Sequence, residues 1–291
     1  MRKEKERPPG AFALQREFEF SRGEFVRVQR LIRALAGIAL LDHKENMVYN
    51  RLVRRLRETG IRTFREYLDL VEQPAAEERR AFVNALTTNL TSFFREAHHF
   101  ELLASFAGAR KLAAPGGEPI RVWSSACSTG EEPYSAAIVL REAACAGEIL
   151  ASDIDTDVLT RAQRGVYDLE AIETLAPERR RRWFLKGVGA NEGRVLVRPE
   201  LKSMVRFSQR NLQADHWPAN ELFDVIFCRN VMIYFSRDAQ RAVLDRFVRV
   251  LRPGGLLFVG HSESYAAGHP ALRHCGKTAY ERRADPSTRA S

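Results

Sequence analysis

The sequence predicts an α/β protein whose largely parallel sheet is preceded by a helical segment. Short apolar runs alternate with amphipathic stretches across residues 119–282, whereas apolar residues recur at three- and four-residue steps across residues 17–86. Strands that alternate with helices form parallel sheets covered on both faces, with ligands at the carboxyl ends of the strands. We therefore expect a binding site at that end of the sheet.

The length of 291 residues allows one large domain and one smaller domain. We expect a disordered leader over residues 1–16, a helical N-terminal domain over 17–88 and a linker with a connecting helix over 89–118. An α/β domain should fill residues 119–291 and hold a small inserted antiparallel β-subdomain at 166–203.

The composition restricts the partners and the compartment. A net charge of +9 favours a polyanionic partner, which charge alone leaves open between nucleic acid, anionic lipid and an acidic protein surface. No apolar run approaches the ~20 residues needed to cross a bilayer, and residues 1–7 are charged, unlike a signal peptide. The four cysteines lack C-x-x-C or zinc spacing, so we expect a reduced, cytoplasmic protein.

Glycines divide the helical segment. A first helix should end at Gly37, and a second, which Asp42 is placed to cap, should end at Gly60; two shorter helices are expected at 63–71 and 75–86.

Basic residues are concentrated on the second of these helices. Arg51, Arg54 and Arg55 fall on one side of it, and residues 44–65 hold seven basic and two acidic side chains, a local net charge of +5. The pattern is typical either of a solvated arginine face or of a docking surface for an acidic partner.

The linker begins with a run of hydroxyl and amide side chains at residues 87–92, which favours a capped loop. His98 and His99 follow it, but adjacent residues on a helix point in different directions and no carboxylate pair completes a metal site. We therefore predict no metal.

One strand–loop–helix–strand unit dominates the α/β part. Its first strand leads into a loop of small residues ending at Gly130, and its second strand ends at Asp153, 23 residues later. That spacing is close to the roughly 20 residues between a nucleotide-binding turn and the acid on the ribose hydroxyls. The loop holds a single glycine, whereas the pyrophosphate of a dinucleotide usually needs a glycine-lined turn, so a dinucleotide ligand is disfavoured. Glu131 would repel a phosphate group but would suit a ligand that carries an ammonium or sulfonium charge. The alternative, an ordinary α/β crossover whose acidic residues only cap a helix, stays open.

The remaining elements continue the alternation, with one interruption. We expect helices at 155–164, 169–175, 177–184 and 236–251, a hairpin with a glycine-rich tip over 184–198, and strands at 204–207, 223–228, 256–259, 272–275 and 278–281. By topology, four segments should meet at the carboxyl ends of the strands, namely Ser124–Glu131, Asp153, Asn211–Leu212 and Arg229–Tyr234.

Five motifs in consistent order make the sequence resemble a known family. They are Asn89–Arg95, Ser128–Tyr134, Ser152–Asp155, Cys228–Phe235 and Leu251–Gly255. Together they resemble the bacterial chemotaxis receptor methyltransferases, the CheR family, over residues 20–282. The resemblance implies a Rossmann-like class I fold dependent on S-adenosyl-L-methionine (AdoMet), with a helical N-terminal domain and an inserted β-subdomain. It also implies methyl transfer to glutamates of chemoreceptors, leaving S-adenosyl-L-homocysteine.

The resemblance also implies roles for individual residues. Arg95 and Tyr234 would flank the methyl-transfer site. The cofactor would be lined by Asn89, Thr91, Arg95, Glu131, Asp153, Asn211, Leu212, Arg229 and Asn230. A glutamate side chain is already an anion at neutral pH, so no general base is required and the residues need only align the reactants.

Two docking surfaces follow as hypotheses. The face formed by Arg51, Arg54 and Arg55 is complementary to glutamate-rich receptor rods. The hairpin at Leu185–Val197, with Gly187 and Gly189, resembles family members that hold a receptor's C-terminal peptide by strand addition. Nothing in the sequence calls for nucleic acid, membrane insertion or more than a monomer.

Three other functions fit the sequence less well. A nucleic-acid methyltransferase would carry an Asn/Asp-Pro-Pro-aromatic segment or a Pro-Cys nucleophile, but the chain has Arg229-Asn-Val-Met and Cys228 follows Phe227. A catalytically silent receptor-binding module would lack Arg95, Asp153 or Tyr234. A nicotinamide oxidoreductase would need the missing glycines.

Overall fold

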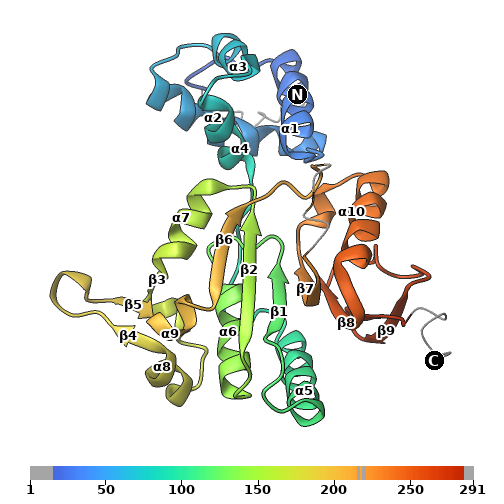
Figure 1. Cartoon of the computed structure of the whole chain (residues 1–291). Coiled ribbons are helices and arrows are strands. Elements are labelled where there is room, and N and C mark those ends of the chain that lie inside the picture. The colour runs from blue at the N-terminus through green and yellow to red at the C-terminus, as the bar shows by residue number, and fades with distance from the viewer. Residues whose placement is uncertain (1–15, 215–216, 218–220, 285–291) are drawn as a thin grey trace, which may run out of the picture.

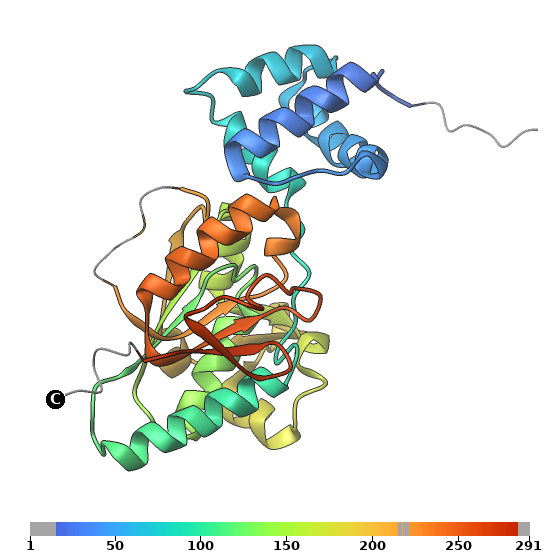
Figure 2. The same cartoon turned by 90° about the vertical axis from the view of Figure 1, so that its right-hand side faces the viewer.

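The computed structural model describes residues 16–214, 217 and 221–284. A helical domain stands on one end of an α/β domain (Figures 1 and 2). The parallel strands point their carboxyl ends toward the helical domain (Figure 1). Residues 1–15 of the predicted disordered leader lie outside the described part, and the boundaries drawn between the domains stay predictions.

The helical domain follows the predicted helices closely. Ser21 and Glu24 form a capping box at the start of the first helix, and Gly37 ends it in the left-handed conformation at φ 71°. Asp42 is not the cap of the second helix: it begins a 3-10 turn, and its carboxylate pairs with Arg22 and accepts from Gln29. The helices are α1 (Arg22–Ala36), α2 (Glu45–Thr59), α3 (Phe64–Glu72) and α4 (Glu78–Leu86).

A seven-stranded sheet forms the centre of the α/β domain, in the order β6-β2-β1-β7-β8-β10-β9. Five neighbouring strands, from β6 to β8, are parallel, and β10 pairs antiparallel with β8 and β9. The strands are β1 (Ile120–Ser124), β2 (Gly147–Asp153), β6 (Val205–Gln209), β7 (Phe223–Cys228), β8 (Leu251–Val259), β9 (Leu272–Gly276) and β10 (Ala279–Arg282). The predicted parallel sheet is confirmed.

Helices pack on both faces of this sheet. Alternation along β1 sends Val122 into one core, with residues of α5 and α6, and Trp123 into the other, with residues of α10. The helices are α5 (His98–Ala113), α6 (Glu131–Glu142), α7 (Thr156–Arg164) and α10 (Arg237–Val250). No helix within the described residues is both long and apolar enough to span a membrane.

A small antiparallel sheet, in the order β3-β5-β4, forms the inserted subdomain at the edge of the molecule (Figure 1). The segment expected as a helix at 169–175 is instead a 3-10 turn, Leu169–Ile172. The other elements are β3 (Val166–Asp168), α8 (Pro177–Trp183), β4 (Phe184–Lys186), β5 (Arg194–Val197) and α9 (Pro199–Lys202).

Direct hydrogen bonds join the two domains. The side-chain amides of Asn211 and Gln213 donate to the carbonyls of Leu35 and Gly37, each at 3.2 Å. The φ of 71° at Gly37 favours glycine, and a Cβ there would lie 1.9 Å from the Gln213 side-chain amide, which would have to move. The end of α1 is thereby held over the carboxyl ends of β2 and β6.

Candidate active site

A pocket of about 890 Å³, including its open mouth, lies at the carboxyl ends of the strands beneath the helical domain. The structure brings to it nearly all the residues that the sequence predicted as cofactor-binding or catalytic. Its lining includes Asn89, Thr91, Arg95, Asp153, Asn211, Leu212, Arg229, Asn230 and Tyr234. The four segments expected to meet there therefore do meet.

Glu131 is the exception among the predicted residues. It is buried, its carboxylate accepts from the Thr129 hydroxyl at 2.7 Å, and it is not part of the pocket lining. The next residue, Glu132, lines the pocket instead. Successive residues in a helix point about 100° apart, so the rotation of α6 decides which of the two acids faces the ligand.

Glu132 and Arg229 form a buried ion pair at the floor of the pocket. Arg229 Nη1 lies 3.0 Å from Glu132 Oε2, and Glu132 also accepts from Ser124 Oγ at 2.6 Å. Burial raises the pKa of Glu132, while the Arg229 guanidinium acts in the opposite direction. Arg229 also donates to the Arg95 carbonyl and lies 3.5 Å from Glu96. Its guanidinium thus contacts three protein groups, and the residue also lines the pocket.

Asp153 is the last residue of β2, and each of its two carboxylate oxygens accepts one backbone hydrogen bond. Oδ2 accepts from the Ser128 N–H at 2.8 Å and Oδ1 from the Asp155 N–H at 3.0 Å. A carboxylate offers about four lone-pair sites, so each oxygen keeps one for a ligand hydroxyl. Burial raises the pKa of Asp153, and the same two N–H donors act against that shift. The carboxylate is therefore fixed in direction yet still able to accept from a sugar.

Asn89 is held over the pocket by Asp155, a role that the sequence did not predict. The Asp155 Oδ2 atom accepts from the Asn89 amide at 2.8 Å and from the Thr87 hydroxyl at 2.6 Å. Its Oδ1 atom caps α7 by accepting from Asp157 and Val158. One buried acid thus fixes both the linker and the helix after β2. The signal was the second acid of the Ser152–Asp155 motif.

Arg95 occupies a tight turn before α5. The residues on either side, Phe94 and Glu96, have φ of 54° and 57°, a left-handed conformation that side chains other than glycine seldom adopt. The Arg95 side chain donates to the Leu90 carbonyl at 2.7 Å and lines the pocket. Backbone strain on both sides of a pocket arginine indicates that the surrounding structure fixes its position.

Tyr234 lies where the two domains meet. Its backbone carbonyl accepts from the Ala39 N–H at 2.8 Å, and its ring packs against the cores of both domains. It lines the pocket together with Ala36 and Ile38 from the helical domain. Sequence reasoning did not find these two residues, because nothing local marks them as binding residues.

The loop glycine has a different role from the expected one. Gly130 has φ 97°, and a Cβ there would lie 2.8 Å from the Ala162 Cβ and 2.9 Å from the Tyr167 hydroxyl. Packing of the protein against itself therefore requires this glycine, in addition to the freedom that its φ requires. Ser128, whose N–H binds Asp153, lines the pocket in its place.

The predicted arginine face is largely used within its own domain. Arg51 donates to the Thr87 carbonyl at 2.6 Å, and Arg55 pairs with Glu78 at 2.8 Å and with Glu58. Arg54 is different, because its side chain is 80% exposed and pairs only with Glu58 in the described structure. Two of the three predicted docking arginines therefore support the fold, and Arg54 carries the accessible charge.

The predicted docking hairpin exposes apolar side chains at its tip. Val188 is 81% exposed and Leu185 is 37% exposed on the edge strand β4. Gly187 sits where a Cβ would lie 2.0 Å from the Asn191 carbonyl oxygen, whereas Gly189 has no such neighbour but has φ 57°. Both glycines are thus required by the shape of the tip.

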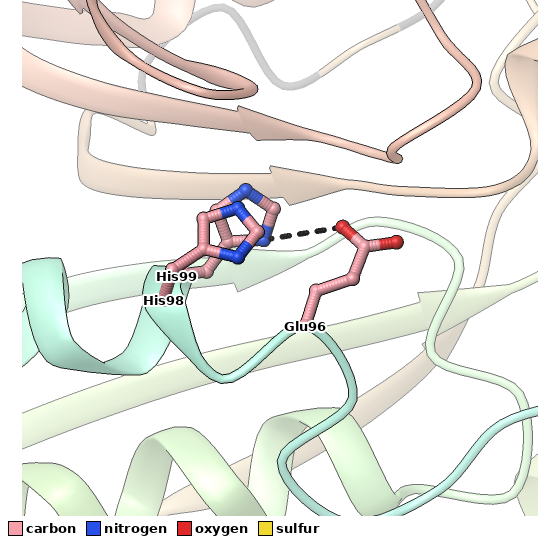
Figure 3. Close-up of side chains that lie close together, drawn as sticks. All are labelled: Glu96, His98 and His99. Carbon is pink, nitrogen blue, oxygen red and sulfur yellow. Dashed lines mark ion pairs between the residues drawn. The ribbon is translucent and has the colours of Figure 1, made fainter.

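His98 and His99 lie side by side near Glu96 (Figure 3). The expectation that they point in different directions is wrong: both Nε2 atoms approach the Thr278 hydroxyl, at 3.4 and 2.9 Å. Glu96 lies 3.6 Å from His99 Nδ1 but also 3.5 Å from Arg229, whose positive charge opposes a cation there. We interpret the cluster as support for the turn that carries Arg95.

Several further residues of the pocket lining carry polar groups. Ser125 and Ser128 belong to the predicted segment Ser124–Glu131, and Glu132 belongs to the Ser128–Tyr134 motif. Thr87, Thr88 and Arg210 were not singled out from the sequence, and only their position beside the predicted motifs could have indicated them. The lining as a whole combines a buried acid with unused lone pairs, a buried ion pair and apolar walls, and it lacks the glycine-rich turn typical of pyrophosphate sites.

Comparison with known families agrees with this site. A family model described as "CheR methyltransferase, all-alpha domain" matches residues 23–87. A second, described as "CheR methyltransferase, SAM binding domain", matches residues 89–280. The two together span most of the chain.

Named relatives are similar over almost their whole length. The chemotaxis protein methyltransferase of Klebsiella aerogenes is 51% identical, covering 89% of this chain and 89% of the relative. That of Escherichia coli (strain K12) is 49% identical, covering 89% and 91%. Chemotaxis protein methyltransferase 2 of Pseudomonas aeruginosa is 46% identical, covering 91% and 94%.

Proposed function

The chain belongs to the CheR family of chemotaxis methyltransferases, and from this premise we propose how its own residues carry out the reaction. It is an AdoMet-dependent enzyme that methylates glutamate side chains of chemoreceptors, and its cofactor is AdoMet. The roles of individual residues and the mode of receptor docking are the proposal.

Asp153 holds the ribose of the cofactor through the lone pair that each of its oxygens keeps. Support comes from its position at the end of β2 and from the two N–H groups that fix its direction. Asn89, Thr91, Asn211, Leu212 and Asn230 complete the cofactor site, since all line the same pocket. Glu132 replaces Glu131 as the acid facing the ligand, and Arg229 acts through its pair with Glu132.

The bound cofactor supplies a methyl group made electrophilic by an adjacent sulfonium. The substrate glutamate attacks as its carboxylate: an O–C bond forms while the S–C bond breaks, and the two opposite charges disappear together. No proton moves, because a glutamate with a pKa near 4.3 is ionised at neutral pH. The enzyme contributes mainly orientation, which can lower the barrier by up to ~7–11 kcal/mol.

Arg95 and Tyr234 orient the substrate carboxylate. A guanidinium fixes both the charge and the plane of a carboxylate, and a phenol adds one hydrogen bond. The observation that carries this assignment is the convergence of both side chains on one pocket from elements 139 residues apart in the sequence.

Transfer of labelled methyl groups from AdoMet to a receptor cytoplasmic fragment tests the proposal. The product should be labile to base, as an ester is. Tyr234→Phe should lower kcat while AdoMet binding, measured by calorimetry, persists, and Arg95→Lys should also lower kcat. Unchanged kcat in both variants would refute the assigned roles.

Receptor docking uses two surfaces in this proposal. The exposed charge of Arg54 attracts the glutamate-bearing helices of the receptor's cytoplasmic region. The hairpin over residues 185–197 binds a C-terminal receptor peptide as a further strand of its sheet. Support comes from the free edge of β4 and the exposed Val188 at its tip. A receptor without its C-terminal peptide should be methylated more slowly by the intact enzyme, and equal rates would remove the hairpin from the proposal.

A further inference from the structure

A buried carboxylate lies directly behind the loop that carries Asn230 and Tyr234. Glu263 follows β8 and is 5% exposed. Its Oε2 atom accepts from the N–H groups of Gly260 at 2.7 Å and Asn230 at 2.8 Å. Its Oε1 atom accepts from those of Met232 at 2.8 Å and Ile233 at 3.3 Å. One side chain thus satisfies four backbone donors.

The charge of Glu263 is balanced by peptide dipoles. Within the described part of the chain no lysine or arginine forms an ion pair with it. Backbone N–H groups that converge in this way form a cradle that binds anions. Burial raises the pKa of Glu263, and the four N–H donors act against that shift. The carboxylate therefore occupies an anion site made of its own backbone.

The loop that Glu263 holds has an unfavourable local conformation. Asn230 has φ 58°, and a Cβ on Gly260 would lie 2.6 Å from the Asn230 amide nitrogen and 2.7 Å from Glu263. On the opposite side, the Gln240 amide donates to the carbonyls of Met232 and Phe235, at 2.7 and 3.2 Å. Glu263 thus fixes the loop through its N–H groups, and Gln240 fixes it through its carbonyls.

We propose that Glu263 is a positioning residue for methyl transfer: by filling the amide cradle behind residues 230–233, it sets the direction of the Asn230 and Tyr234 side chains in the pocket. It also keeps a cradle beside the active site from capturing an external carboxylate, which is the functional group of the substrate itself. The inference rests on the roles proposed above for Asn230 and Tyr234.

Chemical rescue tests this role. In Glu263→Ala, kcat toward a receptor cytoplasmic fragment should fall about tenfold to a hundredfold, because small misplacements of reacting groups cost that much. Acetate, which can enter the vacated cradle, should restore part of kcat, whereas chloride at equal ionic strength should not. Glu281→Ala, which removes a surface carboxylate paired with Arg273, is the matched control and should respond to neither anion.

Hydrogen–deuterium exchange gives a readout that does not depend on catalysis. The amides of Asn230, Met232 and Ile233 should exchange faster in Glu263→Ala and regain protection with acetate. If Glu263→Ala does not fold, Glu263→Gln is the alternative, because it keeps the volume but places an NH₂ group against N–H donors. This variant should show the lower kcat and the faster amide exchange, and acetate should restore neither. Unchanged protection, or a lost kcat that acetate leaves unrestored in folded Glu263→Ala, overturns the proposal. Inactivity of the parent enzyme would instead refute the proposed function.

Discussion

At the scale of single residues, Asp153 shows how a binding group is prepared by its neighbours. Two backbone N–H groups hold its carboxylate and leave one lone pair on each oxygen. In the ribose-binding role proposed for Asp153, the ligand would meet an acceptor that has already lost its freedom of rotation, so little ordering entropy would oppose binding.

Replacing this acceptor should weaken cofactor binding. In Asp153→Asn, an NH₂ group must face either Ser128 or Asp155, whose N–H groups are also donors. Loss of a charge-assisted hydrogen bond costs about 1.5–3 kcal/mol, or roughly 10- to 150-fold in Kd. Calorimetric titration with AdoMet measures this, with the exposed Asp157→Asn as control. A Kd within threefold of the parent would argue against ribose binding.

His99 gives a prediction for pH. Burial, followed by the charge of Arg229, lowers the pKa of His99 to about 2 from an ordinary value of 6.5. The unfolded chain therefore binds a proton below pH 6.5 that the folded protein excludes. The stability that His99 contributes is present above pH 6.5 and is lost as the pH falls, at about 1.4 kcal/mol per pH unit.

Urea unfolding at pH 6.5 and pH 5 checks this. The parent should lose roughly 2 kcal/mol more than His99→Gln over that interval. The exposed His43→Gln should behave as the parent does. His98, Glu96, Arg229 and Lys277 lie beside position 99 and are present in both proteins, so the difference isolates His99. Equal losses in parent and variant would contradict the shifted pKa.

At the scale of elements, α2 separates charges that support the fold from charges that face solvent. Arg55 pairs with Glu78, whose side chain is only 11% exposed and also accepts from the Tyr67 hydroxyl. Arg54 is 80% exposed, and a surface pair such as that with Glu58 contributes little to stability. Two neighbouring arginines should therefore respond differently to substitution.

Arg54→Glu should reduce methylation of a receptor fragment without changing the Kd for AdoMet or the melting temperature. Arg55→Ala should lower the free energy of unfolding by about 1–3 kcal/mol, because it leaves Glu78 without its partner. Initial rates, calorimetry and urea unfolding distinguish the two. Full methylation by Arg54→Glu would remove α2 as a receptor-docking surface.

The inserted hairpin gives a second prediction at this scale. Gly187→Ala places a Cβ 2.0 Å from a backbone carbonyl and should distort the tip, whereas Gly189→Ala meets no neighbour and should cost only about 1–2 kcal/mol for its φ of 57°. Binding of a receptor C-terminal peptide should be lost in the first variant and retained in the second. Retained binding in Gly187→Ala would place the peptide elsewhere.

At the scale of the whole molecule, the pocket depends on how the two domains meet. Ala36 and Ile38 of the helical domain line it, and Asn211 and Gln213 of the α/β domain hold the end of α1. The side chain of Asn211 is therefore directed at the helical domain, so a residue predicted from the cofactor side also maintains the domain contact.

Gly37→Ala should disturb this contact. Its Cβ would lie within 2.2 Å of three atoms of the Gln213 amide, and AdoMet affinity should fall because one wall of the pocket is displaced. Combining Gly37→Ala with Gln213→Ala removes the clash and should restore part of the affinity. Calorimetry of the single and double variants measures the coupling, and strictly additive effects would contradict it.

Several features were accessible from the sequence because they are local. The helix ends at Gly37 and Gly60 follow from chemistry within a few residues. The convergence of the four loops followed from strand order, since parallel strands end at one edge. Glu131, the acid that the resemblance implies, lies outside the pocket lining and Glu132 lies in it, because the rotation of α6 about its axis is set by tertiary packing.

The sequence by itself determined the α/β class, the alternation that builds the parallel sheet, and the motifs that place the chain in its family. Only the tertiary structure decided that Arg51 and Arg55 bind their own domain, that Ala36 and Ile38 close the pocket, and that Glu263 holds the loop carrying Tyr234. The physical reason is range: capping, periodicity and turn chemistry act between neighbours, whereas a buried charge is satisfied by whichever distant donors the packed chain brings to it.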